Sequence, residues 1–121
     1  MSGTDQPYDP PSAAELLAGL RDFFADEVVP ALDEPLRYYV RVAVGVLAQV
    51  SRELSLAPEH REAHARRLRR LEMTSDHELA DAIRRGEMDN RFEEVWTVLR
   101  ADVEDKVRVS NPPILDPDAP A

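Results

Sequence analysis

The sequence contains no cysteine and only four glycines. Without cysteine there is no disulfide framework, no thiolate zinc site and no cysteine nucleophile. The glycines are isolated from one another, so none belongs to a glycine-rich loop that cradles phosphate. Serines are few, and none lies in a nucleophile elbow. We therefore expect no enzyme activity from the chain by itself, with no catalytic residue, no cofactor and no metal site.

Long apolar runs are absent as well. The most apolar stretch, 40–50, contains Arg41 and is much shorter than the roughly 18 residues needed to cross a bilayer. The N-terminal residues show no positive region followed by an apolar block, which a secretory signal peptide requires. The sequence predicts a cytoplasmic protein with no membrane partner.

Composition indicates one globular domain. The chain has 121 residues, of which 43% are hydrophobic and 32% are charged. Three prolines precede the first apolar repeat, so we expect residues 1–11 to form an extended proline-rich arm. The helical domain is expected over 12–115. The Pro, Asp and Ala residues of 116–121 predict a disordered tail.

Charge is distributed unevenly along the chain. Residues 1–34 carry one Arg against eight acids, residues 35–71 carry eight Arg against three acids, and residues 72–121 carry six bases against thirteen acids. The net charge is −9. Non-specific nucleic-acid binding needs a basic face with little acidic competition, so we expect no nucleic-acid partner. The basic segment suits one phosphorylated ligand or an acidic partner.

The hydrophobic pattern predicts an all-α fold, a single compact bundle of about five helices. Apolar residues recur every three or four positions in five segments: 12–30, 33–54, 58–71, 75–86 and 92–109. Ser12 with Glu15 forms a capping box at the first start, and Ser75 with Glu78 forms a second one. Pro58 fits the first turn of the third helix. Gly86 is placed to end the fourth helix in a left-handed conformation.

Two features of the second and last predicted helices bear on packing. The second helix has the widest apolar arc, and Gly45 in its interior suggests a close crossing by a neighbouring helix. The last helix brings six apolar residues to one face: Phe92, Val95, Trp96, Leu99, Val103 and Val107. We expect both helices to contribute strongly to the core.

His60 and His64 lie one helical turn apart, which is a spacing found in metal sites. In the zincin patterns a Glu adjoins one of the histidines, whereas Glu62 is two residues from each. We favour two solvated histidines over a metal site. The run 66–70 contains four Arg, which on a helix spread over most of its circumference, so a solvated face or an acidic-partner contact is favoured over DNA binding.

Four polar residues are candidates for contacts with a partner. Arg37 and Arg41 lie four apart on one helix face, where the favoured interpretation is an ion pair with an acid of the first or last helix. The alternative is that the two arginines bind a phosphate group or a carboxylate of a partner. Lys106 and Asn111 lie at the end of the last helix, where a cation favours the helix dipole and Asn before Pro is an ordinary terminator.

Three segments together resemble a bacterial family of small domains of unknown function, encoded beside aminoglycoside-phosphotransferase-like kinases and acyl-CoA dehydrogenases. The segments are PYDPPSAAELL at 7–17, LRYYVRVA with VL at 36–47, and KVRVSNP at 106–112. The chain is also similar to the small subunit of the two-part kinase of levulinate catabolism. The resemblance extends from Pro7 to about Leu115.

The resemblance implies a non-catalytic accessory subunit. Its partner would be an aminoglycoside-phosphotransferase-like kinase that binds ATP and phosphorylates a hydroxyacyl-CoA, with acyl-CoA as a further contact of the complex. The residues expected at the partner interface are Tyr8, Arg37, Arg41, Lys106 and Asn111. Two alternatives stay open at this point: a free-standing acyl-CoA or small-ligand binding module, and a regulatory or nucleic-acid-binding helical module that uses residues 66–70.

Overall fold

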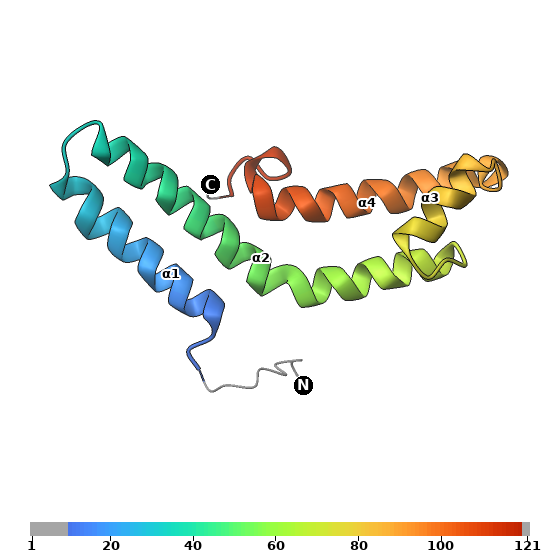
Figure 1. The fold of residues 1–121 in the computed structure, drawn as a ribbon, viewed down its shortest axis with the longest axis horizontal. Coiled ribbons are helices and arrows are strands. Elements are labelled where there is room, and N and C mark those ends of the chain that lie inside the picture. Colours follow the sequence, from blue (N-terminus) through green and yellow to red (C-terminus); the bar gives the residue numbers. More distant parts are fainter. Residues whose placement is uncertain (1–9, 120–121) are drawn as a thin grey trace. The chain divides into compact units, whose positions relative to one another are not determined.

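The computed structural model describes residues 10–119, and those residues form helices and turns with no strand (Figure 1). The four α-helices are α1 (Ala13–Phe23), α2 (Leu36–Arg70), α3 (Asp76–Arg84) and α4 (Phe92–Ser110). Short helical turns follow or precede them: the π-helical η1 (Phe24–Val28) and the 3-10 turns η2 (Val29–Ala31), η3 (Asp89–Arg91) and η4 (Pro112–Ile114). The predicted all-α class is confirmed. Most of the expected proline-rich arm and the end of the expected tail lie outside the described residues.

The chain divides into two compact units, which meet between Ser55 and Leu56 in the sequence. The first unit holds α1 and the first part of α2, and the second holds the rest of α2 with α3 and α4. Each unit is described by itself.

The start of α1 is fixed by the predicted capping box. The backbone N–H of Ser12 donates to Glu15 Oε1 at 2.9 Å, and the N–H of Glu15 donates to Ser12 Oγ at 3.1 Å. These bonds satisfy two of the amide groups that a helix N-terminus leaves without partners. The Ser12 backbone bond, followed by the hydroxyl, lowers the pKa of Glu15, so the carboxylate form is favoured at the positive end of the helix dipole.

The prediction of separate helices before and after Pro58 is wrong, because α2 is one helix of 35 residues with Pro58 inside it. A proline in a helix interior cannot donate to the carbonyl four residues earlier, at a cost of about 3 kcal/mol. Side-chain contacts are made on both sides of the proline. Before it, Ser51 Oγ donates to the Ala14 carbonyl at 3.0 Å, and after it His64 pairs with Asp102 on α4.

The close helix crossing expected at Gly45 is not found. A Cβ placed on Gly45 would meet no atom within 4 Å. The glycine therefore lies on an open part of α2, and no packing requirement among the described residues calls for it.

The first unit is an antiparallel pair, α1 against the first part of α2, and Figure 1 shows the two lying side by side. We call this pair the hairpin. Its buried residues are Val29, Ala48 and Ser51. Leucines and valines such as Leu17 and Leu47 are only half-buried. The hairpin thus has a thin interior for its length.

The second unit contains the larger core. Its buried cluster comes from the end of α2, from α3 and from the first half of α4: Leu68, Leu71, Leu79, Ala82, Met88, Val95 and Val98. Ser75 caps α3 as predicted, since the N–H of Glu78 donates to Ser75 Oγ at 3.1 Å. Gly86 has φ of +78°, which confirms the predicted left-handed end of that helix.

Replacing Pro58 with alanine tests what holds α2 together. The Pro58→Ala variant restores an N–H that can donate to the carbonyl of Leu54, so we expect the free energy of unfolding to rise by about 1–3 kcal/mol. Urea unfolding followed by circular dichroism measures the change. A variant less stable than the wild type would show that the proline is required where it stands.

Candidate functional site

Five ionisable side chains meet where α2 and α4 face each other in the second unit. We call them the α2–α4 cluster: His60, His64, Arg67, Asp102 and Asp105. Arg67 Nη1 lies 2.7 Å from Asp102 Oδ1 and 2.9 Å from Asp105 Oδ2. His60 Nε2 lies 3.7 Å from Asp105 Oδ1. The three α2 residues are spaced four and three apart, and the two aspartates three apart, so each set forms a stripe on one side of its helix.

Arg67 is the most enclosed cation of this cluster. Its side chain is 17% exposed, and the side chains of Asp102 and Asp105 are 21% and 15% exposed. Burial alone would lower the pKa of Arg67, but the hydrogen bonds from Asp102 and Asp105 outweigh it and the pKa is raised. The arginine therefore stays charged, and its charge is compensated by two carboxylates.

His64 joins three helices at one imidazole. Its Nδ1 lies 3.0 Å from Asp102 Oδ2 on α4, and its Nε2 lies 2.7 Å from Asp76 Oδ1 at the start of α3. Carboxylate oxygens accept hydrogen bonds, so both ring nitrogens are placed as donors and the protonated imidazole fits best. Partial burial lowers the pKa of His64, but Asp102 and then Asp76 outweigh it, and the pKa is raised overall.

A cleft of about 390 Å³ lies beside the cluster. It is lined by Leu56, Glu59, His60, Glu62, Ala63, Arg66, Arg67, Asp105 and Arg108. Each lining arginine already has a carboxylate partner: Arg66 lies 3.2 Å from Glu62, and Arg108 lies 3.3 Å from Asp105. The lining includes no serine, threonine or cysteine. The cleft lining therefore contains no hydroxyl or thiol nucleophile, and its arginines are paired with carboxylates.

Metal binding finds no support in the described part of the chain. Over residues 10–119, no group of three or more His, Asp or Glu side chains is arranged to hold a metal ion. The histidines are also not the solvated pair that the sequence suggested, because the side chains of His60 and His64 are 23% and 33% exposed and face carboxylates of α4.

Large apolar side chains are exposed along both helices of the hairpin. Eight large apolar side chains there are between 38% and 63% exposed, and we call them the hairpin face: Leu16, Leu20, Phe23, Tyr39, Val42, Val46, Val50 and Leu54. They recur every three or four residues along each helix.

The second unit also leaves apolar residues uncovered on α4. A groove of about 400 Å³ runs along α4 and the following turn η4, and it is lined by Trp96, Leu99, Arg100, Val103, Glu104, Val107, Ile114 and Leu115. Trp96 is 53% exposed and Phe92 is 65% exposed. The α4 face expected to build the core is thus divided: Val95 and Val98 are buried, and the aromatic residues are not.

The five residues predicted for the partner interface fall in different parts of the chain. Tyr8 lies outside the described residues. Arg37 and Arg41 both lie near the start of α2, where Arg37 Nε donates to the Leu32 carbonyl at 2.8 Å and Arg41 Nη1 lies 4.0 Å from Glu34 Oε1. Arg37 thus holds the turn before α2, and Arg41 remains an exposed side chain.

Lys106 and Asn111 lie in the second unit, at the end of α4. Both residues are exposed, and Asn111 caps the helix through its N–H, which donates to the Val107 carbonyl at 2.7 Å. Lys106 and Asn111 are therefore available to a partner.

Comparison with known proteins identifies the family. The model of DUF6285, a domain of unknown function, matches residues 30–114. The chain belongs to this family. No curated protein and no solved structure matches the chain. The DUF6285 match covers all of α2, α3 and α4, so it includes the α2–α4 cluster and the α2 part of the hairpin face. Among residues 10–119 of this DUF6285 protein, no helix is both long and apolar enough to cross a membrane.

Sequence reasoning missed the α2–α4 cluster. The signal was present: His60, His64 and Arg67 recur at helical spacing, and so do Asp102 and Asp105. Stripes of opposite charge on two helices predict a contact only if the helices are known to be neighbours. The sequence alone does not give that information.

The pH dependence of stability tests the His64 bridge. A raised pKa in the folded state means that the contribution of His64 is complete below its ordinary pKa and is lost as pH rises through the folded value. We expect the unfolding free energy to fall as pH rises above the ordinary pKa of histidine, about 6.5, and the fall to be small because the side chain is one-third exposed. His64→Gln removes this dependence in urea unfolding. His77→Gln, at a side chain that is 85% exposed, is the control. An equal loss in His64→Gln and wild type contradicts the assignment.

Proposed function

We propose that this DUF6285 protein is a non-catalytic accessory subunit of an aminoglycoside-phosphotransferase-like kinase that acts on a hydroxyacyl-CoA in acyl-CoA or hydroxy-acid catabolism. The observation that carries the proposal is the hairpin face. Exposed large apolar side chains that recur along neighbouring helices are typical of surfaces that bind another protein. The kinase as partner follows from the resemblance of the three sequence segments.

The thin interior of the first unit also favours a partner. The hairpin buries Val29, Ala48 and Ser51 but leaves Phe23, Tyr39 and Val46 more than half exposed. A pair of helices with most of its large apolar side chains outside has little to stabilise it alone. Packing against another protein would remove that surface from water at a gain of about 25 cal/mol per Å².

The ionisable residues leave the chemistry to the partner. Arg67, His64 and the aspartates of α4 are engaged with one another, and the cleft beside them has no hydroxyl or thiol side chain in its lining. A subunit that holds or completes a kinase needs neither a nucleophile nor a phosphate loop of its own.

The proposal keeps Tyr8, Arg37, Arg41, Lys106 and Asn111 as partner contacts. Arg41 is the most informative of these in the first unit because its side chain is 60% exposed. Arg37 is less informative about partner binding, because an alanine at this position also removes the hydrogen bond to the Leu32 carbonyl.

Coexpression with the adjacent kinase-like protein tests the function. We expect the two proteins to copurify, and ATP consumption with a hydroxyacyl-CoA substrate to require both. Each protein assayed alone is the control. Kinase activity that is the same with and without this chain, together with no copurification, contradicts the proposal. Copurification with unchanged activity on hydroxyacyl-CoA would retain the partner and reject the substrate class.

A further inference from the structure

A stripe of apolar side chains on α4 lies outside the core of the second unit. Trp96, Leu99, Val103 and Val107 follow one another at intervals of three or four residues, so they share one side of the helix. All four line the groove along α4 and η4. Trp96 and Val103 are more than half exposed. We call this side of α4, from residue 96 to residue 107, the α4 face.

Two side chains of opposite charge belong to the same groove. Arg100 and Glu104 both line it. Within residues 10–119, neither side chain has an ion-pair partner. The arginine precedes the glutamate by four residues, which is the less favourable order for an ion pair along one helix. The α4 face therefore presents one cation and one anion that no described residue neutralises.

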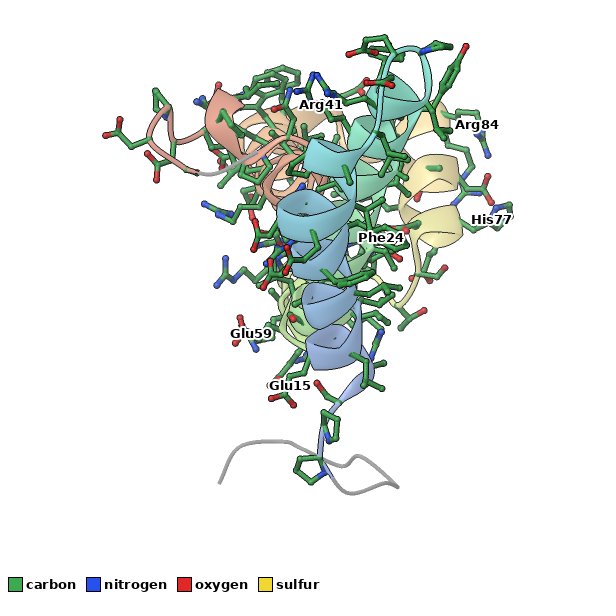
Figure 2. All side chains as sticks on the ribbon, turned by 90° about the vertical axis from the view of Figure 1, so that its left-hand side faces the viewer. Glu15, Phe24, Arg41, Glu59, His77 and Arg84 are labelled. Carbon is green, nitrogen blue, oxygen red and sulfur yellow. The ribbon has the colours of Figure 1, made fainter. Side chains whose placement is uncertain are left out.

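Other charged side chains of the second unit pair within their own helix. Figure 2 shows His77 and Arg84 extending from one side of α3, and both pair with Asp81 between them. Arg66 pairs with Glu62 on α2 in the same way. Local pairing is thus open to exposed charges on these helices, and Arg100 and Glu104 do not make it.

The apolar stripe and the two charges are centred on the same part of α4. Trp96 and Val107 are centred between residues 101 and 102, and Arg100 and Glu104 are centred on residue 102. A two-fold axis through that part of the helix, perpendicular to it, brings a second α4 alongside in the opposite direction. Trp96 then lies opposite Val107 of the other copy, and Arg100 lies opposite Glu104.

The two charges also lie on the same flank of the stripe. At 3.6 residues per turn, Arg100 is rotated about 40° from Trp96, and Glu104 about 80° in the same direction. Two antiparallel helices related by a two-fold axis bring equal flanks together. Each arginine therefore meets a glutamate across the axis, and the same contact occurs twice.

We propose that the α4 face binds a second copy of this chain, with the two α4 helices packed antiparallel across a two-fold axis. The apolar stripes pack against each other, and each Arg100 pairs with Glu104 of the other copy. The inference does not depend on the proposed function, because the hairpin face belongs to the first unit and the α4 face to the second.

The two charges disfavour other occupants of the groove. An acyl chain with an anionic head would pair with Arg100 but would bring its charge near Glu104. A basic peptide would pair with Glu104 and bring its charge near Arg100. Like charges brought together at an interface are unfavourable. A second copy presents both signs in reverse order, so both charges are paired.

Analytical ultracentrifugation of the full chain, over about a hundredfold range of concentration, tests the proposal because a reversible dimer forms by mass action. Trp96 is the single tryptophan of the sequence, so its fluorescence reports directly on the groove. We expect the dimer fraction to rise with concentration, and the emission maximum to move to shorter wavelength in parallel.

An aspartate in the middle of the stripe tests the apolar contact. Val103 is 57% exposed, so Val103→Asp leaves the core of the second unit in place. We expect it to weaken dimerisation by about 30-fold or more. Thr97→Asp is the matched control, because it adds the same charge at an exposed position of α4 outside the groove. The control should dimerise within about twofold of wild type, and circular dichroism checks that both variants retain their helices.

Exchanging the two charges tests the pairing between copies. Arg100→Glu leaves two carboxylates on the face, and Glu104→Arg leaves two guanidinium groups. Each variant alone should dimerise about tenfold more weakly at low salt, with a smaller difference at high salt. An equimolar mixture of the two should form a heterodimer, because every carboxylate then meets a guanidinium group. The double variant Arg100→Glu with Glu104→Arg should dimerise within about threefold of wild type.

Four outcomes overturn the proposal. The first is a wild-type chain that stays monomeric over the whole concentration range. The second is a dimer that Val103→Asp leaves unchanged, since it uses another surface. The third is a wild-type dimer whose two single charge variants do not associate when they are mixed. The fourth is a monomer whose Trp96 emission shifts only when a long-chain acyl-CoA or the kinase is added, which assigns the groove to that ligand instead.

Discussion

The guanidinium of Arg67 lies between two aspartates of α4, and the arrangement of the second unit depends on that contact. The apolar core is confined to the end where α3 joins α2 and α4. Toward the other end of α4, charges rather than apolar side chains connect it to α2. Such a contact is directional, since removing one partner would leave an enclosed charge without compensation. It therefore specifies which sides of α2 and α4 face each other more strictly than a stripe of leucines would.

Because charged side chains make part of the contact between helices, much of the apolar surface stays exposed. Where polar groups join α2 and α4, the aliphatic and aromatic residues of α4 turn away from the contact, and they line the groove that contains Trp96 and Val103. In the hairpin, small residues such as Ala48 and Ser51 face the interior, and the larger Tyr39 and Val46 face outward. Large apolar residues are more often buried than exposed, so this arrangement leaves the hairpin with little apolar interior of its own.

Local signals in the sequence predicted the ends of helices well, because a cap depends on only a few neighbouring residues. Ser12, Ser75 and Gly86 act as their residue types suggest. The prediction of a helix boundary at Pro58 was wrong, because α2 continues through the proline. The local cost of a proline does not by itself decide where a helix ends. The sequence also did not predict which residues of α4 are buried. Val95 and Trp96 belong to one broad apolar arc, and only the position of the neighbouring helices decides which of them is covered. The cluster around Arg67 was missed for the same reason.

The place of Pro58 in α2 has a consequence for how the protein loses its structure. The boundary between the two units falls between Ser55 and Leu56, only a few residues before Pro58, where the backbone ladder of α2 lacks one donor. Cooperativity between neighbouring segments is carried by unbroken hydrogen bonding and shared packing, so it is weakest there. We therefore expect the hairpin and the second unit to open separately rather than as one cooperative unit. A partner that covers the hairpin would order one of them without altering the intrinsic stability of the other.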